Sequence, residues 1–203
     1  MRKTLVALEE KNIPYELDEM LPNSLSAAIG QAPNQKLTEA SPLGKIPAII
    51  SDGGFVNDST IIASYLDKKY PGKNLYPSQP GEYAKARWIE YYSDNVLSSV
   101  SHQKILVERV VKPKVLGIDS DEKIVAEAIK TELPPMLDYL NSQLEGKTWF
   151  AGDEYSMADI AVTTQLLGLE MAGFTIDKDG KWPELHKHMK NSSARDSFKT
   201  ILK

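Results

Sequence analysis

Hydrophobic residues near the start of the chain predict a short helix followed by a strand. The run Leu5–Leu8 has helical spacing, and this pattern ends before Pro14. Apolar side chains then recur between residues 15 and 20, where we expect an extended strand. From residue 22 to 42 no period is sustained, so we predict a loop with one short helix over 25–29.

A β-hairpin and a capped helix are predicted next. The apolar run Ile46–Ile50 is followed by the turn sequence Ser51–Gly54 and by a second short apolar run, which is typical of a hairpin. Asp58 or Ser59 then caps a helix. The apolar face of this helix is expected to carry Ile61, Ile62, Tyr65 and Leu66.

Helical patterns without strand alternation fill the rest of the chain. The segment Pro77–Gly81 is rich in turn residues and marks a linker. We therefore predict a first domain over 1–76, a linker over 77–81 and an all-helical domain over 82–203. The expected helices span 82–111, 121–144, 156–172 and, as a shorter pair, 183–202. Pro134 and Pro135 predict a kink or a break in the second of them.

Composition narrows the class of protein. The 203 residues are 41% hydrophobic and 26% charged, which suits a globular protein with a packed core. The net charge of −4 argues against nucleic acid and anionic lipid as partners. Without cysteine there is no thiolate metal site and no cysteine nucleophile. No signal peptide or membrane span is recognisable, so we expect a cytoplasmic protein with no membrane partner.

Two short motifs in the first domain are candidates for a ligand site. Pro47 stands where a strand opens, either as an ordinary strand-start residue or as part of an exposed functional edge. Asp58 and Ser59 stand where a helix begins. They are either an ordinary N-cap or a site at which helix N–H groups hold a carboxylate while Asp58 holds an amine.

Other conspicuous residues have structural interpretations. Ser156 and Asp159 match a capping box, for which we expect a role in folding. The histidines are expected at the surface, and no metal site is predicted from them. Phe174, near a helix end, is a candidate for an apolar substrate pocket, although a core position is the commoner role. The nucleotide-binding, metalloprotease and α/β-hydrolase signatures are all absent.

Four segments in order carry a resemblance to a known family. These are RKTLVALEEKNIPYE, ASPLGKIPAIISDGGFVNDSTIIASYLDKKYP, TWFAGDEYSMADIAVT and WPELHKHMKNSSARDSFK. Together the chain resembles the cytosolic glutathione S-transferases over nearly its whole length. The resemblance implies an α/β plus all-α fold: a thioredoxin-like N-terminal domain followed by a helical C-terminal domain.

The resemblance also implies a site and a partner. Ile46 would bind the cysteinyl part of glutathione through its backbone, with Pro47 cis, while Asp58 and Ser59 would hold the γ-glutamyl end. Lys45 would reach the glycine carboxylate. Glutathione would be the cosubstrate and small apolar electrophiles the second substrate, with no metal and with a homodimer as the expected assembly.

One departure from the family concerns the first strand. Family members place a strand and a catalytic Ser, Tyr or Cys before the helix that here starts at Met1 or Arg2. The thioredoxin-like domain is therefore expected to lack its middle strand, which leaves the strand near Tyr15 without a neighbour, and the catalytic residue is unknown. The chain is either a conjugating transferase, a non-catalytic binding or scaffold protein, or a related glutathione-dependent isomerase or reductase.

Overall fold

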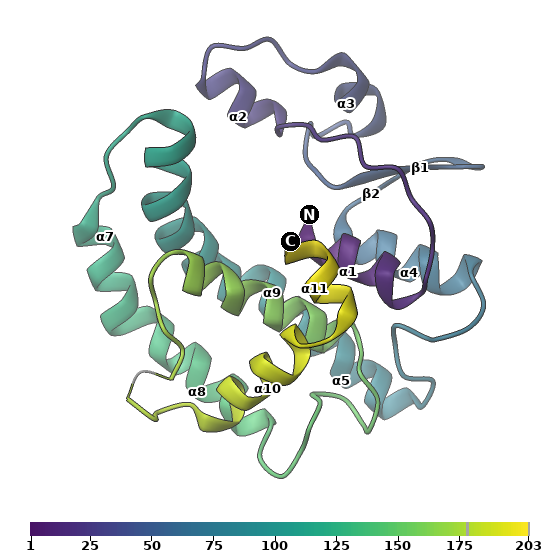
Figure 1. Ribbon diagram of the computed structural model, residues 1–203, viewed down its shortest axis with the longest axis vertical. Helices are drawn as coiled ribbons and strands as arrows, with labels where there is room; N and C mark the ends of the chain where they lie inside the picture. The colour runs from purple at the N-terminus through teal and green to yellow at the C-terminus, as the bar shows by residue number, and fades with distance from the viewer. Residues whose placement is uncertain (178, 203) are drawn as a thin grey trace. The chain divides into compact units, whose positions relative to one another are not determined.

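The computed structural model describes residues 1–177 and 179–202, which form two compact units (Figure 1). Unit 1 spans Met1–Leu75 and unit 2 spans Tyr76–Lys203. The boundary therefore falls between Leu75 and Tyr76, and the first helix of unit 2 begins at Pro80.

Unit 1 combines four helices with one small sheet over its described residues. Its elements in chain order are α1 (Arg2–Glu10), α2 (Asn23–Ala28), α3 (Gln35–Ala40), β1 (Ala48–Ser51), β2 (Gly54–Asn57) and α4 (Ser59–Lys69). The sheet is the predicted hairpin. β1 and β2 pair antiparallel, with Ser51 opposite Gly54 at the turn and Ala48 opposite Asn57 at the open end.

Two expectations for unit 1 are wrong. Residues 15–20 do not form a strand, because no other strand among the described residues lies alongside to complete a ladder. The loop before the hairpin holds two helices and not one. The second, α3, begins where the side chain of Asn34 accepts a hydrogen bond from the Leu37 N–H at 3.1 Å, and it buries Leu37.

The core of unit 1 lies where α1 meets α4. Val6 and Ala7 of α1 and Ile62 and Ala63 of α4 are fully buried. A buried ion pair joins the same helices, since Lys11 Nζ lies 3.2 Å from Asp67 Oδ1 and also donates to the Lys73 carbonyl at 2.8 Å. A buried charge of this kind is tolerated only when it is paired and hydrogen-bonded. Packing thus holds α4 and its N-terminus in place.

Over its described residues, unit 2 consists of helices joined by loops and contains no strand. A continuous run contains α5 (Pro80–Tyr91), η1 (Tyr92–Leu97), α6 (Ser98–Val100) and η2 (Ser101–Leu116), of which η1 and η2 have the wider π-helical winding. The run ends at Gly117, whose φ of 65° is left-handed. A second run contains α7 (Glu122–Glu127), the π-helical η3 (Ala128–Glu132) and α8 (Leu133–Gln143). The winding changes directly before Pro134.

The remaining helices complete the core of unit 2. They are α9 (Met157–Met171), α10 (Pro183–Ser193) and α11 (Asp196–Leu202). Helix α9 is buried around most of its circumference and packs against α5, η2 and α10, which identifies it as the central helix. Among the described residues, no helix is both long and apolar enough to cross a bilayer.

Candidate functional site

The register of the hairpin brings the two predicted motifs to one end of unit 1. Ala48 pairs with Asn57, so the next residues outward on each strand are Pro47 and Asp58. The hairpin turn lies at the opposite end, at Asp52 and Gly53. A site that draws on Ile46, Pro47, Asp58 and Ser59 is therefore assembled at the open end of the hairpin by strand pairing alone.

The backbone of Ile46 is available to a ligand. The Ile46–Pro47 peptide bond is cis. Neither the N–H nor the C=O of Ile46 exchanges a backbone hydrogen bond with another residue in the described part of the chain. Buried or half-buried backbone groups are normally paired, and Ile46 is half-buried. Its donor and acceptor match the main-chain groups of a peptide-like ligand.

Asp58 caps α4 from an unusual backbone conformation. Its φ of 69° and ψ of 131° lie in a region that side chains with a Cβ rarely adopt. One carboxylate oxygen, Oδ1, accepts from the N–H groups of Thr60 at 2.8 Å and Ile61 at 3.3 Å. The exposed carboxylate retains its second oxygen for a cation such as an ammonium group.

Ser59 and Lys45 offer groups that can bind an anion at the same end of the hairpin. Ser59 is the first residue of an eleven-residue helix, and over the described residues its N–H and hydroxyl have no protein partner. The helix dipole favours a carboxylate there. The exposed Lys45 ammonium has no ion-pair partner among the described residues, and the Lys45 N–H donates to the Ser41 hydroxyl at 3.2 Å.

A hydroxyl cluster at the turn end of the hairpin escaped the sequence interpretation. Tyr65 Oη and Lys69 Nζ each lie 2.6 Å from Ser51 Oγ, and Lys69 also pairs with Asp52 at 2.9 Å. Hydrogen bonding with Lys69, reinforced by Ser51, lowers the pKa of Tyr65 below its usual value of 10.0. The spacing of Tyr65 and Lys69 by four residues on a helix was the signal that could have indicated the pair.

The predicted capping box of unit 2 is present, but Asp159 does more than cap. Its Oδ2 accepts from the Ser156 N–H at 2.8 Å and from the Ser156 hydroxyl at 3.0 Å. Its Oδ1 accepts from the Phe150 N–H at 3.0 Å and lies 2.9 Å from His188 Nε2. Asp159 is fully buried, so these contacts serve the fold.

The surface position expected for the histidines is wrong for His188. This residue is 2% exposed because Asp159 offers it a buried acceptor and Trp149 and Phe150 contact its ring edge-on. His188 is polar and lies only two positions from His186, so the pattern of apolar residues did not predict its burial. Within residues 1–177 and 179–202 no group of three or more metal-binding side chains gathers in one place.

Phe174 packs within unit 2. It follows α9, is half-buried, and its ring centroid lies 6.2 Å from that of Trp182. The Phe174 N–H donates to the Leu169 carbonyl at 3.0 Å, which secures the end of the helix.

Comparison with known proteins identifies the family of this chain and agrees with the fold. Residues 1–74 match the model of the glutathione S-transferase N-terminal domain, and residues 97–196 match that of the C-terminal domain. Glutathione S-transferase U19 of Arabidopsis thaliana is 30% identical over 98% of this chain and 83% of its own length. GstB of Escherichia coli is 26% identical over 86% and 80%. The chain belongs to the glutathione S-transferase family.

Solved structures agree with this assignment. A glutathione S-transferase from Methylobacillus flagellatus with glutathione bound is 25% identical, with a TM-score of 0.76 over 98% of this chain and 92% of that one. FzlA from C. crescentus is 20% identical, with a TM-score of 0.85 over 99% and 86%, and shows the fold alone. The expected class, a thioredoxin-like N-terminal domain followed by a helical domain, is confirmed.

Proposed function

We propose that this chain binds glutathione at the open end of the hairpin and conjugates it, through its sulfur atom, to small apolar electrophiles. The observation that carries the proposal is the set of unused groups at Ile46, Asp58 and Ser59, in a chain of this family. Ser59 and the N-terminus of α4 would hold the γ-glutamyl carboxylate, and Asp58 the neighbouring ammonium. Ile46 would pair with the cysteinyl backbone, and Lys45 would reach the glycine carboxylate.

The chemistry requires a glutathione thiolate. A free thiol has a pKa of about 8.5, so each unit of lowering needs about 1.4 kcal/mol of preferential stabilisation of the thiolate. The thiolate would then attack the electrophilic atom of the substrate, forming a thioether and expelling the leaving group. Phe174 is proposed as part of the apolar substrate pocket. No residue is assigned to thiol activation.

Binding and turnover are tested separately. Glutathione binding is measured by isothermal titration calorimetry for the parent chain and for Ser59→Ala, which removes one donor to the carboxylate. We expect about a tenfold loss of affinity, as the loss of a charge-assisted hydrogen bond implies. Asp52→Asn, at the other end of the same hairpin, is the matched control and should bind as the parent does. Equal affinity of Ser59→Ala and the parent would refute the assignment.

Turnover of a panel of electrophiles then decides between two functions. Conjugation supports the transferase. Glutathione binding without turnover across the panel supports a non-catalytic binding or scaffold protein. The beta-etherase LigF, 20% identical with a TM-score of 0.79, shares the fold, so the panel includes an ether to test other glutathione-dependent reactions.

We propose a cytoplasmic homodimer as the working form. An exposed aromatic pair on α5 supports a subunit contact, since Trp88 and Tyr91 are 50% and 56% exposed with ring centroids 6.0 Å apart. Sedimentation equilibrium tests the assembly. Tyr91→Ser should shift the parent dimer toward monomer, and a monomeric parent chain would refute the proposal.

A further inference from the structure

The loop of residues 41–46 is fastened to α2 by Asn23. This asparagine is the first residue of α2, and its N–H donates to the Gly44 carbonyl at 2.9 Å. The first N–H groups of a helix have no acceptor inside the helix, so a loop carbonyl can bond to one of them. Gly44 directly precedes Lys45, which is proposed to reach the glycine carboxylate of glutathione. The loop is therefore anchored one residue before a proposed ligand contact.

Gly44 allows the loop to lie directly against the Asn23 side chain. Its φ is 60°, and a Cβ built on it would lie 2.8 Å from both Cβ and Nδ2 of Asn23. A side chain at this position would therefore meet a steric clash as well as a left-handed backbone. Because Gly44 is also buried, the close contact leaves the loop little room to shift.

Both polar atoms of the Asn23 amide bond to the start of α3. Oδ1 accepts from the Asn34 N–H at 2.9 Å, and Nδ2 donates to the Thr38 hydroxyl at 2.9 Å. The Thr38 hydroxyl in turn donates to the Asn34 carbonyl at 2.9 Å. Because this hydroxyl has one proton, it can only accept from the residue at position 23. An amide meets this requirement, whereas a carboxylate of the same shape would place acceptor against acceptor.

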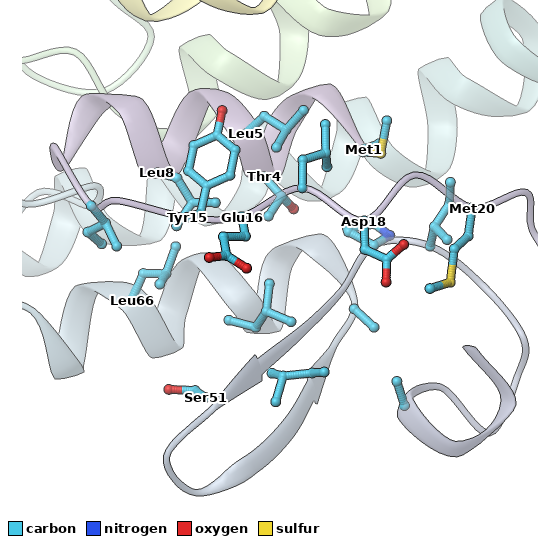
Figure 2. Close-up of a pocket in the computed structure, with 18 of the residues that line it drawn as sticks. Met1, Thr4, Leu5, Leu8, Tyr15, Glu16, Asp18, Met20, Ser51 and Leu66 are labelled. Carbon is cyan, nitrogen blue, oxygen red and sulfur yellow. The ribbon is translucent and has the colours of Figure 1, made fainter. Parts of the chain in front are cut away.

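Helix α3, which receives these bonds, is itself held in place. It packs against β1 and β2, and its Leu37 is 3% exposed. Its Lys36 forms an ion pair with Asp18, which Figure 2 shows on the backbone segment that precedes α2. Asn23 therefore connects the 41–46 loop to a helix that is packed on the hairpin.

Ser41 anchors the same loop from its other end. The Gly44 N–H donates to the Ser41 carbonyl at 2.8 Å, and the Lys45 N–H donates to the Ser41 hydroxyl at 3.2 Å. Together with the bond from Asn23, these contacts fix the backbone of residues 44 and 45, while the N–H and C=O of Ile46 stay free for a ligand. A loop that is already ordered loses less conformational entropy on binding, so its anchors contribute to affinity.

We propose that Asn23 is a positioning residue of the glutathione site: its hydrogen bonds hold residues 44–46 so that the Lys45 ammonium meets the glycine carboxylate. The inference rests on the proposed glutathione site, in which Asn23 is not one of the ligand contacts. Asn23 would then control how well the site distinguishes glutathione from γ-glutamylcysteine, the same peptide without its glycine.

Hydrogen exchange followed by NMR tests the anchor without a ligand. Asn23→Asp keeps the size of the side chain but loses the donor to Thr38. The Lys45 N–H should exchange at least fivefold faster than in the parent, with exchange in β1 and β2 unchanged. Gln35→Ala is the matched control, because the exposed Gln35 side chain bonds to Glu39 of the same helix. Unchanged exchange at Lys45 in Asn23→Asp would overturn the proposal.

Calorimetry with two ligands tests the link to Lys45. The parent should bind glutathione more tightly than γ-glutamylcysteine, and Lys45→Ala should reduce that preference. Asn23→Ala, which adds no charge, should weaken glutathione binding about fivefold but γ-glutamylcysteine binding less than about twofold. In the Lys45→Ala background, the same change should weaken glutathione binding less than about twofold. Equal losses for both ligands would indicate a general packing effect and contradict the positioning role.

Two substitutions of Thr38 test the partner of the Asn23 amide. Thr38→Val removes the acceptor and should weaken glutathione binding in the same direction as Asn23→Ala, about twofold to threefold. Thr38→Ser keeps the hydroxyl and should bind as the parent does. Thr38 is exposed, so both variants are expected to fold. Equal affinities of the valine and serine variants would contradict a role for this bond.

The binding results also separate this inference from the proposed function. If the parent chain binds neither ligand, the glutathione site is wrong as a whole and the positioning role is refuted with it. If the parent binds glutathione and Asn23→Ala binds it equally well, the site stands and only the role of Asn23 is refuted.

Discussion

At the residue scale, Asp58 combines a structural and a proposed binding role. Its positive φ is expected to cost free energy for a residue with a Cβ, and the cap on Thr60 and Ile61 offsets part of that cost. Backbone strain of this kind gathers at functional sites, which supports the binding role proposed for Asp58 beside its role as the N-cap.

Substitution of Asp58 separates these roles. Asp58→Asn keeps a capping oxygen and tolerates positive φ, so its free energy of unfolding should stay within about 0.5 kcal/mol of the parent value. Asp58→Ala loses the cap and should cost about 2 kcal/mol. Both changes remove the charge proposed to hold the glutathione ammonium, so both should weaken binding. Urea unfolding and calorimetry measure the two effects, and normal binding by Asp58→Asn would contradict the ammonium contact.

Asp159 illustrates a residue whose importance lies in folding. We expect Asp159→Ala to lower the free energy of unfolding by about 3 kcal/mol or more, because it leaves the Phe150 and Ser156 N–H groups and His188 without their buried partner. Chemical denaturation measures the loss. The exposed Asp153 provides the control, and Asp153→Ala should change the stability by less than about 0.5 kcal/mol.

At the element scale, one carboxylate joins the end of η2 to the start of α7. Glu108 is 5% exposed, and its Oε2 accepts from Lys112 Nζ at 2.8 Å and from the Asp121 N–H at 2.9 Å. The hydrogen bond from Lys112, then that from the Asp121 N–H, lowers the pKa of Glu108 below its ordinary value of 4.5.

This junction predicts an acid dependence of stability. Because the pKa of Glu108 is lower in the folded than in the unfolded chain, its contribution is present above pH 4.5 and is lost as the pH falls through the folded pKa. Glu108→Gln should be less stable than the parent at pH 7, and the difference should shrink toward pH 3. Urea unfolding at both values measures it. A difference independent of pH would contradict the assignment.

The elements predicted correctly are those that depend on residues close together in the sequence. The hairpin follows from its turn residues and α4 from its Asp58 cap, and both are present. The strand over 15–20 needed a neighbour, which local pattern cannot supply. Ile61 was placed on the apolar face of α4 yet is 56% exposed, because burial depends on what packs against the helix. His188 was missed for the same reason, since its acceptor is 29 residues away.

At the scale of the whole molecule, ligand binding and stability are linked. If glutathione binds unit 1 in its folded state, a concentration of one hundred times the dissociation constant should add about 2.7 kcal/mol to the free energy of unfolding. Thermal unfolding with and without glutathione measures the shift. Ser59→Ala at the same concentration should gain less, and an equal gain in both proteins would place the ligand elsewhere.

The division into two units has an optical consequence. All three tryptophans, Trp88, Trp149 and Trp182, belong to unit 2, and unit 1 contains none. Indole emission is therefore intrinsic to the helical half and carries no direct signal from the half that contains the hairpin. The unfolding transition followed by tryptophan emission and the one followed by hydrogen exchange of residues 1–75 will coincide only if both units unfold together. A single tryptophan placed in unit 1 would make its unfolding visible to a fluorimeter.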